Sequence, residues 1–116
     1  MNIGRYGEDR ACEYLERKPC IIIKRNFYTR IGEIDIIAKE GNNLVFIEVK
    51  TRIGLSAGYP YEAITAKKLM TIRRVARIFL QEQKQSFAAL RVDVISIVLS
   101  HELKVIELQH FENVDL

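Results

Sequence analysis

The sequence predicts an α/β fold in which helices flank a mixed five-stranded sheet, in the order helix, three strands, helix, two strands. Two segments, near the N-terminus and around residues 65–84, space their apolar residues as amphipathic helices do. Five segments rich in β-branched residues, separated by short turns, read as strands. The link from the third to the fourth strand passes through the long helix, and such a crossover places those two strands parallel.

Composition sets the broad class. A chain of 116 residues with 48% apolar and 28% charged residues is typical of one soluble domain, here residues 1–116 with the last few as a frayed tail. The net charge of +3 is too small to identify a partner. The chain has no secretory apolar segment and no apolar run of bilayer-spanning length. Cys12 and Cys20 form no CxxC motif, which favours reduced thiols and a cytoplasmic protein.

The first helix is predicted from Tyr6 to Arg17 and ends before Pro19, because proline disfavours helix in the residue before it. Its apolar stripe consists of Ala11, Cys12 and Leu15. The other elements follow from turn residues and periodicity. We expect strands at residues 20–27, 32–38, 44–50, 91–99 and 103–108, turns at 29–32 and 40–43, a loop at 51–62, and a second helix from an N-cap at Thr65 to about Lys84.

Two of these strands carry charge where apolar residues would be expected. Side chains alternate between the faces of a strand, so Glu48 and Lys50 share a face. By the same rule Asp35 shares a face with Glu33. The full predicted sets are Leu44, Phe46, Glu48 and Lys50 on one face of the later strand, and Glu33, Asp35 and Ile37 opposite Ile34, Ile36 and Ala38 on the earlier one. If these strands pair, Asp35, Glu48 and Lys50 converge, and buried charges of this kind require a partner or a metal.

Asp35, Glu48 and Lys50 together suit a site that binds a divalent cation and a phosphate. Mg²⁺ prefers carboxylate oxygens and often also binds substrate phosphate, and the Val49 carbonyl could add a further oxygen. Lys50 would position water or stabilise developing charge, since neighbouring carboxylates oppose the lowered pKa that a general base needs. Glu33 would be a further ligand or a brace for Lys50. The alternative is a structural pair between Glu48 and Lys50 at one end of the sheet.

Glu8 lies in the middle of the stripe by which the first helix should pack on the sheet. Two interpretations remain open. As a first-turn glutamate, it would stay hydrated and interact favourably with the helix dipole. Alternatively, it is a third carboxylate directed toward Asp35 and Glu48.

The second helix carries a basic stripe beside its apolar face. A stripe of this kind is either a solvated surface or an electrostatic footprint for a phosphate backbone. The candidate nucleic-acid-binding residues are Arg52, Lys67, Arg73, Arg74 and Arg77. Tyr59 and Tyr61 either stack on bases and gate the site or pack locally.

Other catalytic chemistries find little support. His101 and His110 lie late in the chain, without HExxH spacing or a nearby cysteine pair. The chain has no GxSxG elbow and no GxxxxGK[ST] phosphate loop.

Four segments carry a family resemblance: residues 4–8 (GRYGE), 32–38 (GEIDIIA), 46–52 (FIEVKTR) and 91–94 (RVDV). The second and third resemble the D…(D/E)xK core of the restriction-endonuclease-like nuclease superfamily. To about Phe111 the chain resembles the YraN-type (UPF0102) family, described as predicted endonucleases distantly similar to archaeal Holliday-junction resolvases. Two positions differ from the usual pattern: Ile34 replaces a common proline and Val92 a phenylalanine.

The resemblance implies a three-layer restriction-endonuclease-like fold and a Mg²⁺- or Mn²⁺-dependent endonuclease acting on DNA, with branched or junction DNA as a candidate substrate. It also implies a metal site at Glu8, Asp35 and Glu48 with Lys50 beside it, these four being the catalytic residues. Action on two strands would favour a two-fold homodimer. Two other classes stay open: a nucleic-acid-binding module, with RNA not excluded, that cleaves nothing, and a protein-interaction domain.

Overall fold

A computed structural model describes residues 1–114 and confirms the predicted order of helices and strands, adding one 3₁₀ turn. The helical elements are α1 (Ile3–Glu16), η1 (Pro60–Ala63) and α2 (Ala66–Gln81). The strands are β1 (Cys20–Thr29), β2 (Gly32–Glu40), β3 (Asn43–Ile53), β4 (Ala89–Leu99) and β5 (Val105–Phe111).

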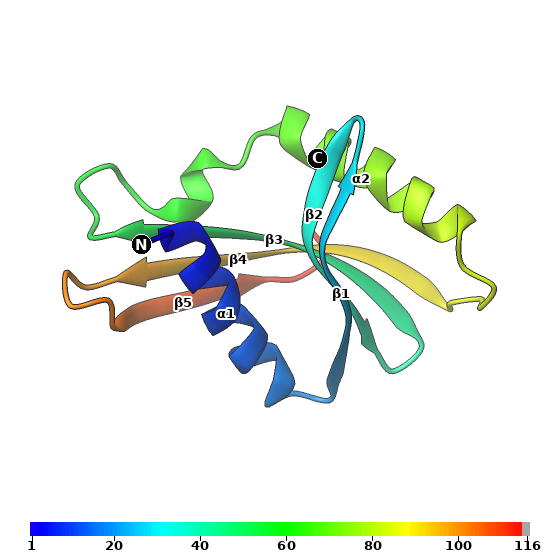
Figure 1. Cartoon of the computed structure of the whole chain (residues 1–116), viewed down its shortest axis with the longest axis horizontal. Coiled ribbons are helices and arrows are strands. Elements are labelled where there is room, and N and C mark those ends of the chain that lie inside the picture. Colours follow the sequence, from blue (N-terminus) through cyan, green and yellow to red (C-terminus); the bar gives the residue numbers. More distant parts are fainter. Residues whose placement is uncertain (115–116) are drawn as a thin grey trace.

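The five strands form one mixed sheet in the order β1-β2-β3-β4-β5. The β3–β4 pair is parallel, as predicted from the crossover through α2, and the other neighbouring pairs are antiparallel. The two long helices pack on opposite faces of the sheet (Figure 1). This arrangement is the predicted three-layer α/β architecture.

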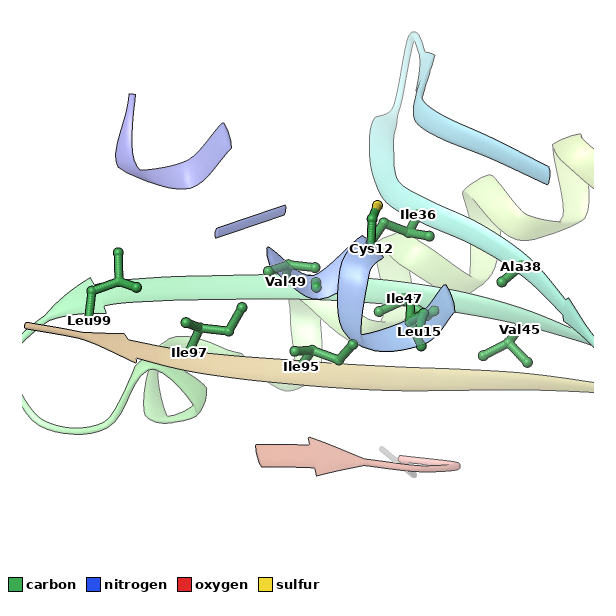
Figure 2. Packing of buried hydrophobic residues seen from close by; sticks show 11 residues of the cluster. Cys12, Leu15, Ile36, Ala38, Val45, Ile47, Val49, Ile95, Ile97 and Leu99 are labelled. Atoms are coloured by element: carbon green, nitrogen blue, oxygen red, sulfur yellow. The ribbon is translucent and has the colours of Figure 1, made fainter. Parts of the chain in front are cut away.

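The core has two parts, one on each face of the sheet. The α1-side core joins the predicted stripe of α1 to alternate residues of β2, β3 and β4 (Figure 2). The α2-side core contains Phe79, whose ring meets those of Phe27 and Phe46 edge to face at centroid distances of 5.3 and 6.1 Å. Because Phe46 faces α2, alternation along β3 directs Glu48 and Lys50 to the same side.

β2 and β3 separate at one end. Their ladder runs from Glu40↔Asn43 only to Ile36↔Ile47, although β3 continues to Ile53. Beyond this point the β1–β2 ribbon bends away from the sheet (Figure 1). The β1–β2 register shifts between Ile22 and Lys24, as at a β-bulge, and such irregularities bend strands.

This bend makes one prediction wrong. Ile34 was expected on the same face as Ile36 and Ala38, yet it packs in the α2-side core with Ile37, whereas Ile36 and Ala38 lie in the α1-side core. Strict alternation holds only while a strand stays in its ladder, and β2 leaves the ladder next to Asp35.

Several predicted boundaries move. α1 begins earlier, at Ile3, where the Asn2 side chain accepts a hydrogen bond from the Arg5 backbone N–H at 3.0 Å. The Thr65 cap is confirmed by a 3.1 Å hydrogen bond from the Lys68 backbone N–H. β3 extends to residue 53 into the predicted loop, α2 ends at residue 81, and β5 runs over residues 105–111.

Three smaller points complete the description. Cys12 and Cys20 are free thiols, and Cys12 is buried in the α1-side core. Neither helix within residues 1–114 is long and apolar enough to cross a membrane. The predicted frayed tail falls partly on residues 115–116, which lie outside the described residues.

Candidate functional site

Asp35 and Glu48 come together where β2 and β3 separate. Both side chains are buried, with 7% and 6% of their residue surfaces exposed. Asp35 Oδ2 accepts a hydrogen bond of 2.8 Å from the backbone N–H of Val49, beyond the end of the β2–β3 ladder. The carboxylate thus satisfies an amide that β2 would have bonded had the ladder continued.

The pKa of Asp35 is raised to about 8. Burial is the largest cause, followed by a hydrogen bond with Glu48 and the negative charge of Glu48. The Val49 N–H and the charge of Lys68 act in the opposite direction and are outweighed. The surroundings therefore disfavour ionisation of Asp35 next to Glu48, and Asp35 keeps its proton at neutral pH unless a cation binds.

Lys68 of α2 forms an ion pair with Glu48, although it was not predicted as a site residue from the sequence. Its Nζ lies 3.5 Å from Glu48 Oε2, and its side chain remains 40% exposed. A usable signal existed in the sequence. Lys67 and Lys68 occupy the first turn of α2, directly after the Thr65 cap, where the helix dipole favours acidic residues.

Lys50 is half-buried on β3, with Ser96 as its neighbour on β4. Its ammonium forms no ion pair within 4.0 Å with any other described residue. The structural pairing of Lys50 with Glu48, the alternative raised from the sequence, is therefore absent, since Glu48 pairs with Lys68 instead.

Glu8 approaches this region from α1. It lies in the second turn of the helix and not in the first, where one interpretation placed it, and its side chain is 16% exposed. Its carboxylate accepts a 2.9 Å hydrogen bond from Asn26 Nδ2 and lies 4.0 Å from Arg25 Nη2. Burial raises the pKa of Glu8, the charges of Asp35 and Glu33 add to the rise, and Asn26 and Arg25 oppose it.

The preceding glycine sets the position of Glu8. A Cβ atom on Gly7 would lie 1.8 Å from Thr51 Oγ1, so only glycine allows α1 to approach β3 this closely. The contact brings α1 against the residue directly after Lys50. It explains why the segment before Glu8 carries glycine.

Glu8 and Glu33 both line a polar cavity of about 470 Å³ between α1, β1 and β2, together with Arg5 and Arg25. Among residues 1–114, no three His, Cys, Asp or Glu side chains are close enough together to hold a metal ion. Of the predicted set, the structure brings Asp35 and Glu48 together and holds Glu8 apart on Asn26, within electrostatic range of Asp35.

The predicted nucleic-acid-binding residues fall into two groups. Arg52 donates a hydrogen bond to the Ala57 carbonyl and so holds the loop after β3. Lys67, Arg74 and Arg77 are exposed on α2. Arg73 donates a 3.3 Å hydrogen bond to the Val114 carbonyl and, with Arg74 and Arg77, lines a groove of about 280 Å³.

A second buried polar cluster, also missed from the sequence, lies on the α1 side of the sheet. Asp93 is fully buried and accepts hydrogen bonds from Arg91 at 2.9 and 3.0 Å, from His110 Nε2 at 2.8 Å, and from the Asn113 backbone at 2.9 Å. The other ring nitrogen of His110 lies 2.9 Å from the Tyr14 hydroxyl. Burial works to raise the pKa of Asp93, but these hydrogen bonds outweigh it and lower that pKa.

Comparisons with a family model and with individual relatives point to the same protein family. The model of the uncharacterised protein family UPF0102 matches residues 7–97, a range that includes Glu8, Asp35, Glu48 and Lys50. A UPF0102 protein of Caldicellulosiruptor saccharolyticus is 43% identical over 111 residues, covering 96% of this chain and 94% of the relative.

Two further relatives carry the same family name. A UPF0102 protein of Rhodococcus opacus is 46% identical over 101 residues, covering 87% of this chain and 86% of the relative. One of Dictyoglomus thermophilum is 39% identical over 111 residues, covering 96% and 94%. The chain belongs to the uncharacterised protein family UPF0102.

Proposed function

We propose that this protein is a Mg²⁺- or Mn²⁺-dependent endonuclease that hydrolyses phosphodiester bonds in DNA, with branched or junction DNA as its substrate. The observation that carries the proposal is the Asp35–Glu48 pair. Burial, together with the neighbouring carboxylate of Glu48, raises the pKa of Asp35 to about 8, and Lys68 forms an ion pair with Glu48. Two adjacent buried carboxylates that cannot readily ionise together, next to cationic groups, are suited to binding a cation and a phosphate together.

The donor set fits a hard divalent cation. Carboxylate oxygens are the ligands that Mg²⁺ and Mn²⁺ prefer, and a dication would remove the repulsion between Asp35 and Glu48. These two residues would hold the ion, and Glu8 would contribute the third negative charge. When bound, such an ion supplies charge neutralisation on the phosphodiester and a more acidic water.

The chain's own residues would then perform the remaining tasks. Lys50, which has no ion-pair partner within 4.0 Å among the described residues, would hold the attacking water or a non-bridging phosphate oxygen. Lys68, paired with Glu48 yet 40% exposed, would contact the phosphate from the α2 side. Fixed positive groups around a phosphodiester stabilise the charge that develops as the bond breaks.

Binding of the DNA backbone would use α2. Two lysines in its first turn reinforce the positive end of the helix dipole beside Glu48. Arg73, Arg74 and Arg77 continue the basic stripe along the helix. Because each phosphate contact releases counterions, replacing Arg74 and Arg77 with alanine should reduce the slope of log affinity against log salt by about 0.9 per lost contact.

The test is cleavage of four-way junction, flap and duplex DNA by the full chain with Mg²⁺ or Mn²⁺. Asp35→Asn and Lys50→Ala should each reduce cleavage to the background of a no-protein control. Glu102→Gln and Lys104→Ala serve as matched controls, since both residues are exposed in or beside the β4–β5 turn and should keep full activity.

Cleavage that persists in both Asp35→Asn and Lys50→Ala would exclude this site. Salt-dependent DNA binding without cleavage, with every metal tried, would instead favour the nucleic-acid-binding module. Titration of RNA in the same assay decides whether the substrate class extends beyond DNA.

A further inference from the structure

An apolar cavity of about 290 Å³ opens on the α2 side of the sheet, outside the carboxylate pair. Its walls come from η1 and the residue after it, α2, β4, β5 and the segment after β5. The lining residues are Tyr61, Ile64, Leu69, Val94, Phe111 and Val114.

This cavity lies one strand away from the candidate catalytic row. Val94, in its wall, is the direct β4 neighbour of Glu48 in the parallel β3–β4 ladder. Ser96 is the β4 neighbour of Lys50, and its Oγ accepts a 3.1 Å hydrogen bond from the Tyr61 backbone N–H. Since neighbouring strands are about 4.8 Å apart, the cavity and the Glu48–Lys50 row are adjacent.

Aromatic rings form one side of the cavity. Tyr61 and Phe111 pack with ring centroids 5.1 Å apart, and Tyr61 stacks on Tyr59 at 5.4 Å with nearly parallel planes. The two tyrosines are part-buried, and Phe111 remains 37% exposed. A flat ring entering from solvent would meet Phe111 together with the apolar side chains of Leu69 and Val94, which line the same cavity.

Lysine side chains near the cavity favour a negatively charged ligand. Leu69, in its wall, directly follows Lys67 and Lys68 in the sequence of α2, and Lys68 forms an ion pair with Glu48. A ligand that suits both features has a flat apolar ring joined to phosphates. An unpaired nucleotide has this composition, whereas a base within a duplex keeps its faces covered by its neighbours.

We infer that this cavity binds an unpaired nucleobase belonging to a nucleotide beside the phosphate held near Glu48 and Lys50. The inference rests on the proposed function and specifies its substrate, because the site then selects nucleic acid with at least one unstacked nucleotide, as at a flap or a branch point. Fully paired duplex DNA would leave the cavity empty and bind less tightly.

The test uses a flap oligonucleotide with 2-aminopurine at the unpaired position next to the branch, bound to the full chain in EDTA so that no cleavage occurs. Stacking of 2-aminopurine on an aromatic ring quenches its fluorescence. The wild-type chain should quench the flap probe but not a probe with 2-aminopurine inside the duplex. Phe111→Leu should lose the quench and bind the flap about 5- to 100-fold more weakly, as expected for one base–aromatic stack.

Three further variants sharpen the test. Phe111→Tyr keeps an aromatic ring and should restore both quench and affinity. Tyr61→Leu provides a second, independent loss of the aromatic wall if Phe111→Leu folds poorly. Ile106→Ala, at an exposed position of the same strand β5, is the matched control and should behave as wild type.

The outcomes separate this inference from the nuclease proposal. Quench and affinity that are unchanged in Phe111→Leu and Tyr61→Leu overturn the base cavity, whatever the cleavage assay shows. A quench that depends on Phe111, in a chain that cleaves nothing with any metal, supports the cavity and rejects the nuclease. If these substitutions change only self-association, measured by light scattering, the cavity is a contact between copies of the chain and the inference fails.

Discussion

Asp35 and Asp93 are two buried aspartates of the same sheet, in β2 and β4, with opposite surroundings. Asp93 accepts hydrogen bonds from Arg91, His110 and the Asn113 backbone, and its pKa is lowered. Asp35 accepts one backbone hydrogen bond and lies against Glu48, and its pKa is raised to about 8. Burial opposes the ionised form of both residues, so the difference comes from their neighbours.

The comparison distinguishes a structural carboxylate from one suited to function. Around Asp93 the fold supplies the compensating charges itself, and the result is a network that ties α1, β4 and β5 together. Around Asp35 the compensation is incomplete, so a ligand from solution could complete it. Perturbed pKa values of this second kind cluster at functional sites.

The largest expected effect is the loss of stability in Asp93→Asn. Removing this charge leaves Arg91 without its main partner, and breaking a buried pair in this way typically costs about 3–5 kcal/mol. Asp35→Asn should leave the free energy of unfolding at pH 7 unchanged or higher, because asparagine resembles the protonated carboxyl. Urea unfolding measures the free energy of unfolding of both variants, and equal losses of stability in the two would contradict this prediction.

The two aspartates should also give opposite pH dependences of stability. The pKa of folded Asp35 is raised, so the free energy of unfolding falls as pH rises from about 4 to 8, by up to about 1.4 kcal/mol per pH unit. The pKa of Asp93 is lowered, so its contribution is present above its ordinary pKa and is lost as pH falls through the lowered value. Unfolding curves between pH 3 and 9 for each variant and the wild type separate the contributions. A falling branch as steep in Asp35→Asn as in the wild type would refute the assignment, since the raised pKa of Glu8 accounts for only part of the fall.

A divalent cation should stabilise the protein through Asp35 but not through Asp93. Mn²⁺ or Mg²⁺ at about 100 times its dissociation constant should raise the free energy of unfolding by about 2.7 kcal/mol at pH 8. The gain should shrink at pH 5, where protons compete with the metal for Asp35. Thermal unfolding with and without metal measures it, and Asp35→Asn should abolish the gain whereas Asp93→Asn should retain it.

The smallest effect is expected at Lys68. Its ion pair with Glu48 is 40% exposed on the lysine side, so Lys68→Met should change the free energy of unfolding by only about 1 kcal/mol or less. Because the charge of Lys68 lowers the pKa of Asp35, its removal should raise that pKa further. Carboxyl NMR titration of Asp35 tests this, with Lys67→Met in the same helical turn as the control. An unchanged titration in Lys68→Met would contradict the coupling.

Sequence periodicity was sufficient for most of the fold. The stripe of α1, the Thr65 cap and the parallel β3–β4 pair are all set by local patterns or by connection length, and the structure confirms them. Alternation also placed Glu48 and Lys50 on one face correctly, because β3 stays within its ladder there. It failed at Ile34, where β2 leaves the ladder and local spacing no longer defines a face.

The candidate site, like the fold, could be predicted from the sequence only in part. Asp35 and Glu48 could be selected because charged residues within apolar strands stand out in the sequence. The partners of Lys68 and His110 could not be assigned, since Lys68 pairs with Glu48 about 20 positions away and His110 with Asp93, 17 positions away. No local pattern records which strand or helix a side chain will face across such a distance.

Residue type and spacing were enough to locate each strand and helix to within a few residues, and to identify the carboxylates that would be costly to bury. How those charges are compensated followed only from the folded arrangement. The separation of β2 from β3 gives Asp35 a free backbone amide and a carboxylate neighbour, whereas the closed part of the sheet gives Asp93 an arginine and a histidine. The physical reason is that electrostatic compensation depends on distance in space, and the folded chain sets that distance.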